Sequence, residues 1–146
     1  MAALDLANFL PFRLNQLAAE ISGRLSTIYA ERFGLDVPQW RVLATLVDRD
    51  GATAQEIVES TRTHKSTISR AVQALIERGL VQAGADEADG RARKLALTAS
   101  GRAMMDEIVP LARNFERDLL RKVGGLESRQ FLEGLGALES VLRTAR

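Results

Sequence analysis

Apolar residues recur at steps of three and four near the start of the chain, which is the spacing of one face of a helix. These residues are Leu10, Leu14, Leu17, Ile21, Leu25 and Ile28. The pattern predicts a helix from about Phe9 to Phe33, with Asn8 as its cap and Pro11 in its first turn, where a missing amide hydrogen costs little. Gly34 is expected to end this helix.

Two capping boxes follow, each with an oxygen acceptor at the helix cap and a Glu or Gln three residues later. Asp36 and Gln39 form the first box, and Thr53 and Glu56 form the second. The second box opens a short helix, which leads through a tight turn into a longer helix ended by Gly79. The three helices predicted in this part of the chain run over about residues 36–50, 53–60 and 64–78.

Beyond Gly79 the pattern changes to two short apolar runs around a polar loop, which is typical of a β-hairpin. Thr98 then caps a long helix with Pro110 inside it, and Pro110 is expected to kink this helix rather than end it. The pair Gly124-Gly125 breaks the chain before a last helix. The predicted strands run over residues 80–83 and 94–97, and the predicted helices over about residues 99–123 and 128–144.

This order of elements predicts a mainly helical fold, a winged helix-turn-helix with a two-stranded β-hairpin as its wing. No linker long enough to divide domains interrupts the sequence, so we expect residues 1–146 to form a single domain. Residues 34–98 are its winged lobe, and the long helices of residues 1–33 and 99–146 flank that lobe. The apolar stripes of the flanking helices can bury one another within one chain, or can bury those of a second chain.

The predicted helix over residues 64–78 has an apolar side and a polar side. The apolar side consists of Ile68, Ala71, Val72, Leu75 and Ile76, and the polar side of Thr63, Ser66, Thr67, Arg70 and Gln73. In a helix-turn-helix, the amino-terminal residues of the second helix reach the base edges in the major groove. Arginine pairs there with guanine, whereas serine and threonine contact bases or phosphates.

Charge supports nucleic-acid binding only locally. The net charge of the whole chain is +1, which carries no information about nucleic acid. Between Ser60 and Arg78, however, four cations stand against one acid. A solvated helix face without a partner is the alternative interpretation of this segment. The DNA contacts that we predict in it are Thr63, His64, Lys65, Ser66, Thr67, Ser69, Arg70 and Gln73.

The hairpin loop is rich in acids, glycine and arginine, and reads DEADGRARK from Asp86 to Lys94. An arginine at such a tip suits a narrow minor groove, where negative potential is concentrated. Arg91 is the candidate, Asp89 is close enough along the chain to hold its guanidinium, and Arg93 is a further predicted DNA contact. A hairpin whose charges only make it soluble is the alternative.

Composition and local context remove several other classes of function. The chain has no cysteine and one histidine, so disulfides are excluded and we expect neither a metal site nor a cofactor. No apolar run approaches the ~18 residues of a membrane span, and the first ten residues lack the features of a signal peptide. We therefore expect a cytoplasmic protein without membrane contact. His64 lies at a helix cap and the acids are scattered, so no catalytic residue is assigned and an enzyme is not expected.

The run STRTHKSTISRAVQALIERGLV at residues 60–81, followed by DGRARKLALTASG at residues 89–101, resembles the MarR family of bacterial transcription regulators. DVPQWRVLATL at residues 36–46 is similar to the helix that precedes the helix-turn-helix in that family. One departure is Gly90, which stands where the family often has a charged residue. The positions that match the family are Ser66, Thr67, Ser69 and Arg70 in the second helix, Asp89 and Arg91 in the wing, and Thr98 and Gly101 after it.

The resemblance implies an obligate homodimer that binds pseudo-palindromic operators in double-stranded DNA, with Arg91 in the minor groove and Asp89 supporting it. It also suggests a repressor that is released by a small aromatic acid, bound in a cleft bordered by the first, second and long helices. Candidate lining residues are Arg13, Tyr29, Phe33 and Trp40, of which Arg13 would pair a carboxylate. The alternatives are a monomer, aromatic residues that only pack in the core, and an architectural or protein-binding winged helix without sequence preference.

Overall fold

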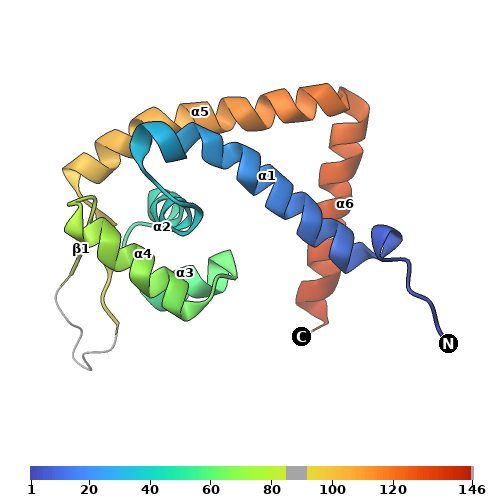
Figure 1. Cartoon of the computed structure of the whole chain (residues 1–146), viewed down its shortest axis with the longest axis horizontal. Coiled ribbons are helices and arrows are strands. Elements are labelled where there is room, and N and C mark those ends of the chain that lie inside the picture. Colours follow the sequence, from blue (N-terminus) through green and yellow to red (C-terminus); the bar gives the residue numbers. More distant parts are fainter. Residues whose placement is uncertain (85–91, 146) are drawn as a thin grey trace. The chain divides into compact units, whose positions relative to one another are not determined.

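The computed structural model describes residues 1–84 and 92–145 of the chain, and its mainly helical fold with one small sheet is the predicted one (Figure 1). The chain divides into two compact units, Met1–Val109 and Pro110–Arg146. The elements are η1 (Leu6–Asn8), α1 (Leu10–Phe33), α2 (Val37–Asp48), α3 (Ala54–Thr61), α4 (Lys65–Glu77), β1 (Val81–Ala83), β2 (Leu95–Leu97), α5 (Ala99–Val123) and α6 (Gly125–Thr144).

Both predicted capping boxes are present. The Asp36 carboxylate accepts from the Gln39 amide at 2.8 Å, and the Gln39 side chain accepts from the Asp36 amide at 3.1 Å. Thr53 and Glu56 make the same reciprocal pair at the start of α3. Gly34 ends α1 with φ +66°, a left-handed conformation that glycine adopts without strain. These local signals fix where α1 ends and where α2 and α3 begin.

The core of the first unit lies where α4 packs on α2 and α3. The apolar side of α4 is buried as predicted, with Ile68 and Leu75 at 0% exposure. Ile57 of α3 and Leu43 of α2 are equally inaccessible and belong to the same hydrophobic cluster. Burial of this side leaves the polar side of α4 as the one that can face solvent.

The hairpin is bonded to the rest of the lobe through its second strand. β1 and β2 are antiparallel, with Val81 opposite Leu97 and Ala83 opposite Leu95. On the other side of β2, the Leu95 amide donates to the Ala52 carbonyl, and its carbonyl accepts from the Gly51 amide, both at 3.0 Å. The α2–α3 connection therefore pairs with β2 like a short third strand, as a hairpin too small to be stable alone requires.

A close backbone contact joins the hairpin to α5. Thr98 caps α5 as predicted, accepting from the Gly101 amide at 3.0 Å, and it donates to the Gly79 carbonyl at 2.5 Å. Gly101 is buried against Leu80, and a Cβ on Gly101 would lie 2.0 Å from the Leu80 carbonyl oxygen. Only glycine fits this crossing of α5 over the chain between α4 and β1.

Two predicted helix starts are wrong. Asn8 does not cap α1, because its side-chain Nδ2 donates to the Asp5 carboxylate at 2.6 Å, and Phe9 is the N-cap. α6 begins at Gly125 rather than near Ser128. The Ser128 hydroxyl donates to the Leu120 carbonyl at 2.6 Å, so it satisfies the end of α5 and not the start of its own helix. α5 runs through Pro110 without ending, as predicted.

Candidate nucleic-acid interface

The outward side of α4 carries a continuous row of polar side chains. Ser66, Ser69, Arg70 and Gln73 are all exposed, and their spacing places them along one side of the helix. Lys65 at the first position of α4 is also exposed. We call this row of Ser66, Ser69, Arg70 and Gln73 the α4 ridge. It is the largest group of predicted DNA contacts that the structure brings together.

His64 is the N-cap of α4. Its Nδ1 accepts from the Ser66 amide at 3.2 Å and lies 2.9 Å from the Ser66 hydroxyl. Its role in the structure is to begin the helix, and the remaining free amides of the first turn are suited to an anion such as a phosphate.

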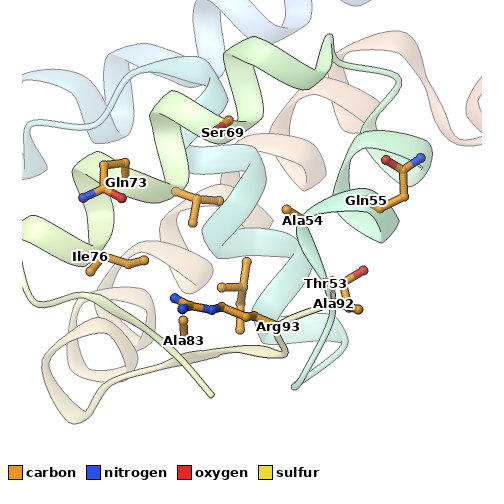
Figure 2. A pocket seen from close by; sticks show the side chains of 11 residues that line it. Thr53, Ala54, Gln55, Ser69, Gln73, Ile76, Ala83, Ala92 and Arg93 are labelled. Carbon is orange, nitrogen blue, oxygen red and sulfur yellow. The ribbon is translucent and has the colours of Figure 1, made fainter. Parts of the chain in front are cut away.

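A groove runs along one flank of the α4 ridge (Figure 2). It has a volume of about 410 Å³ and separates α4 from the start of α3 and from the base of the hairpin. Ser69 and Gln73 form its α4 side, and Arg93 lies across from Ser69 on the hairpin side. Gln55 of α3 lines the same groove, and sequence reasoning did not select it. Hydrogen-bonding groups from three elements thus meet at the edge of the α4 ridge.

A second groove, of about 430 Å³, lies on the other flank. Thr67 and Arg70 line it from α4, and Asp36 and Gln39 line it from the start of α2. Thr67 is half-buried, so it is less accessible than the α4 ridge. Arg70 is exposed and stands at the boundary between this groove and the ridge.

The turn before α4 is ordered by hydrogen bonds. Arg62 has φ +53°, the one left-handed non-glycine residue in the described part of the chain. Thr63 is half-buried, and its hydroxyl accepts from the Arg41 guanidinium at 3.2 Å and donates to the Thr61 carbonyl at 3.3 Å. Sequence reasoning missed Arg41, because it precedes Thr63 by 22 positions and has no local signature.

Arg78 does not belong with the cations of this surface. Its guanidinium donates to the carbonyls of Phe33 and Gly34 at the end of α1, each at 2.9 Å. The basic groups that remain near the turn and the first half of α4 are Arg62, Lys65 and Arg70, all of them exposed. Arg78 is therefore lost from the predicted group of cations, while Arg41, which contacts Thr63, is added to it. Asp89 and Arg91 of the predicted wing tip lie outside the described residues.

The aromatic residues proposed for an effector lie in and beside the core. Tyr29 stacks on Trp40 with ring centroids 5.2 Å apart and an interplanar angle of 13°. Phe33 is buried one turn further along α1. The Tyr29 hydroxyl is buried and has no hydrogen-bond partner among the described residues. Burial raises the pKa of Tyr29, while the nearby Arg41 charge opposes the increase, so the hydroxyl keeps its proton at neutral pH.

Arg13 lies apart from these aromatic residues. Sixteen positions of one continuous helix separate it from Tyr29, which corresponds to about 24 Å along the axis of α1. Arg13 is exposed, whereas Tyr29 is buried. Within one chain, the two side chains cannot hold the same small ligand.

None of the helices in residues 1–84 and 92–145 is long and apolar enough to cross a membrane. Among the same residues, no group of three His, Asp or Glu side chains is placed to hold a metal ion.

A short helix, a tight turn, a second helix with a polar ridge and a β-hairpin together define a winged-helix DNA-binding protein. The profile of the MarR family matches residues 33–92, which span this lobe up to the hairpin. A MarR family transcriptional regulator of Silicibacter pomeroyi DSS-3 has a solved structure that is 31% identical, with a TM-score of 0.82 over 96% of this chain and 99% of that one. The chain belongs to the MarR family of transcriptional regulators.

Two other relatives agree with this assignment. The transcriptional regulator HosA of Escherichia coli O111:H- is 27% identical over 99 residues, which is 68% of this chain and 73% of HosA. The PcaV transcriptional regulator of Streptomyces coelicolor, solved in complex with its natural ligand, is 26% identical with a TM-score of 0.75, and the similarity covers the whole of both chains. These relatives are transcriptional regulators and not enzymes.

Proposed function

We propose that the protein is a homodimeric repressor that binds a pseudo-palindromic operator and is released by a small aromatic acid. The observation that carries the DNA-binding part is the α4 ridge, exposed on the side of α4 that turns away from the core. A two-fold dimer presents two such ridges, and these fit half-sites about one helical turn of DNA apart. Access to chromosomal DNA makes the cytoplasm the proposed location.

Roles on DNA follow from the chemistry of each side chain. Arg70 is proposed to pair with a guanine, while Lys65 and the amides after His64 contact phosphates. Ser66, Thr67, Ser69 and Gln73 lie near enough to the same surface for direct or water-mediated contacts. In the wing, Arg91 is proposed to enter the minor groove with Asp89 as its support, and Arg93 to contact the backbone at the groove of Figure 2.

The proposed dimer buries apolar side chains that a single chain leaves in solvent. In the first unit, Phe9, Leu10 and Phe12 are 40–52% exposed around the start of α1. In the second unit, Leu132 and Leu142 of α6 are 50% and 61% exposed. Large apolar side chains gathered in this way favour a protein partner. We assign residues 34–98 to DNA binding, and residues 1–33 and 99–146 to dimerisation.

The effector part rests on the Tyr29–Trp40 pair. A buried hydroxyl without a partner costs free energy, and a ligand carboxylate that accepted a hydrogen bond from the Tyr29 hydroxyl would remove that cost. Tyr29 and Phe33 are buried, so an aromatic effector would have to enter beside the half-buried Trp40 ring that stacks on Tyr29. Arg13 is too distant to share this ligand within one chain, so we assign its contact to the second copy of α1. The ligand in the PcaV structure supports a small-molecule effector for this chain as well.

Selection of bound duplexes from random DNA tests the proposal. We expect one pseudo-palindrome to be enriched and to bind at least about 10³-fold more tightly than a scrambled duplex. Aromatic acids should quench Trp40 fluorescence and weaken binding to that duplex together. Equal affinity for all duplexes, with a steep salt dependence, would identify an architectural DNA-binding protein instead. Quenching without a change in DNA affinity would contradict the effector part alone.

A further inference from the structure

Arg41 links α2 to the turn that starts the recognition helix α4. Its guanidinium donates from Nη1 to the hydroxyl oxygen of Thr63 at 3.2 Å. The contact joins residues 22 positions apart and is partly buried. Within the described residues, no other α2 side chain forms a hydrogen bond with the turn 62–64, which connects α3 to α4.

The turn 62–64 has little support of its own. Arg62 holds a left-handed conformation that costs a non-glycine residue about 1 kcal/mol. Thr63 uses its hydroxyl twice, donating to the Thr61 carbonyl at 3.3 Å and accepting from Arg41. His64 follows directly and caps α4. A shift of the turn would therefore shift the first residues of α4, where DNA contacts are expected.

Arg41 is placed to act within the protein and not only as a surface charge. It is half-buried and forms no ion pair with any described residue. It lies next to Trp40 in the chain, and its charge is close enough to the Tyr29 hydroxyl to affect the pKa of that group. A guanidinium in such a place forms a charge-assisted bond with a neutral hydroxyl, which is stronger than a bond between two neutral groups.

We propose that Arg41 is a positioning residue for DNA binding, which holds the Thr63 hydroxyl, fixes the turn 62–64 and so sets the direction in which the start of α4 meets the major groove. This inference rests on the proposed function of α4. It also assigns Thr63 a role inside the protein, in place of the direct DNA contact that the sequence predicts.

The test compares Arg41→Gln, Thr63→Val and the double variant with the wild-type protein on the duplex selected from random DNA. Valine keeps the shape of threonine and removes the hydroxyl, and Thr63→Ser is the matched control because it retains that group. We expect each single variant to bind about tenfold more weakly, and Thr63→Ser to bind like wild type. The double variant should be no weaker than the poorer single variant, because both remove the same bond.

Salt dependence separates positioning from direct contact. If Arg41 acts through Thr63, no phosphate contact is lost, and Arg41→Gln keeps the wild-type slope of log affinity against log salt. A slope reduced by about one, with additive losses in the double variant, would show that Arg41 itself binds a phosphate and would overturn the proposal. Wild-type affinity in both single variants would overturn it as well. If Arg41→Gln does not fold, the DNA affinities of Thr63→Val and Thr63→Ser test whether the Thr63 hydroxyl is needed. Equal affinities of these two variants would overturn the proposal.

Hydrogen exchange in the free protein gives a readout that does not depend on DNA. Amides of residues 62–66 should exchange faster in Arg41→Gln and Thr63→Val than in wild type and Thr63→Ser, while those of the buried half of α2 should not change. Unchanged exchange in the turn would refute its dependence on Arg41. A wild-type protein without any preferred duplex would instead refute the proposed function, and the exchange result would remain interpretable.

Discussion

The guanidinium of Arg78, just past the last residue of α4, donates to the main-chain carbonyl of Phe33 in the last turn of α1 at 2.9 Å. A second bond of the same length reaches the carbonyl of Gly34. Carbonyls at the end of a helix have no partner within it and carry a partial negative charge, so a cation is well placed there. The contact fixes the carboxyl end of the recognition helix to the carboxyl end of α1.

Replacing Arg78 by alanine should lower the free energy of unfolding by about 1–2 kcal/mol, because two charge-assisted bonds are lost at a partly exposed site. Arg78→Lys should retain part of that stability, since one ammonium cannot bond both carbonyls with the same geometry. Urea unfolding followed by circular dichroism measures both. Arg49→Ala, at another exposed helix end, is the control and should change stability by less than about 0.5 kcal/mol. Equal losses at the two sites would contradict the role given to Arg78.

Gly101→Ala should destabilise the protein by about 3 kcal/mol or more, because the new Cβ would lie 2.0 Å from the backbone oxygen of Leu80. Gly23→Ala is a matched change within α1, where no described atom outside the neighbouring residues and the backbone of the same helix lies within 4 Å of the added carbon. That control should gain up to about 1 kcal/mol from helix propensity. Thermal unfolding of both variants tests the difference, and a mild effect at Gly101 would mean that α5 can move away from the hairpin.

Alkaline pH should destabilise the fold through Tyr29. Burial raises the pKa of its hydroxyl in the folded state above the unfolded value of about 10, so the unfolded state loses this proton first. The stability linked to the group is complete below that unfolded pKa and is lost as the pH rises through the folded pKa. Because Tyr29 is the only tyrosine of the chain, its ionisation can be followed directly by absorbance near 295 nm.

Tyr29→Phe isolates this contribution from the titration of lysines. At pH 8 the variant should be as stable as wild type or more stable by up to about 1 kcal/mol, because it removes a buried hydroxyl without a partner among the described residues. Its unfolding midpoint in urea should fall less than that of wild type between pH 9 and pH 11. A tyrosine that titrates near 10 in the folded protein, with parallel pH profiles, would argue against its burial.

Arg70→Ala and Lys65→Ala should weaken DNA binding in different ways, the first by loss of sequence preference and the second by loss of a phosphate contact. Loss of Arg70 should cost about 1–3 kcal/mol on the selected duplex and relax the preference at one base pair in each half-site. Loss of Lys65 should weaken binding to all sequences alike and reduce the salt slope by about one. Titrations against single-base variants of the operator, at several salt concentrations, provide both measures. If Lys65→Ala relaxed the base preference and Arg70→Ala only reduced the salt slope, the roles proposed for Arg70 and Lys65 would be reversed.

Association of two chains can be tested at α6. Leu142 is 61% exposed, so Leu142→Asp should change the stability of an isolated chain by less than about 0.5 kcal/mol. In a dimer that buries this side of α6, the same substitution should cause dissociation and loss of operator binding. Ser140→Asp, on the opposite side of α6, is the control. Sedimentation that finds wild-type protein monomeric at micromolar concentration would contradict the dimer itself.

Local signals in the sequence were sufficient for most of the fold. The capping boxes at Asp36 and Thr53 predicted helix starts correctly, because their bonds join residues three positions apart. The predicted helix starts at Asn8 and near Ser128 were wrong, because these side chains bond to other partners. Each has a competing acceptor, the Asp5 carboxylate in one case and the Leu120 carbonyl in the other, and a propensity rule cannot rank such alternatives.

For the site, the sequence predicted the exposed ridge of α4 but not the contacts behind it. The polar side of α4 follows from helical spacing, which needs no tertiary information. Arg41 and Arg78 act on residues 22 and more than 40 positions away, so their partners emerge only when the helices are packed. The same packing placed Tyr29 and Phe33 in the core, whereas the distance of about 24 Å between Arg13 and Tyr29 already follows from the rise of one continuous helix.

The two bonds between Leu95 and the segment Gly51–Ala52 have a mechanical consequence. They tether the base of the hairpin to the connection in front of α3, so this base cannot swing while the helices stay still. We therefore expect the base of the hairpin to move together with α3 and the end of α2. In the proposed dimer, an effector would therefore change the spacing between the two DNA-binding lobes. It would not move the hairpin base of one lobe relative to its helices.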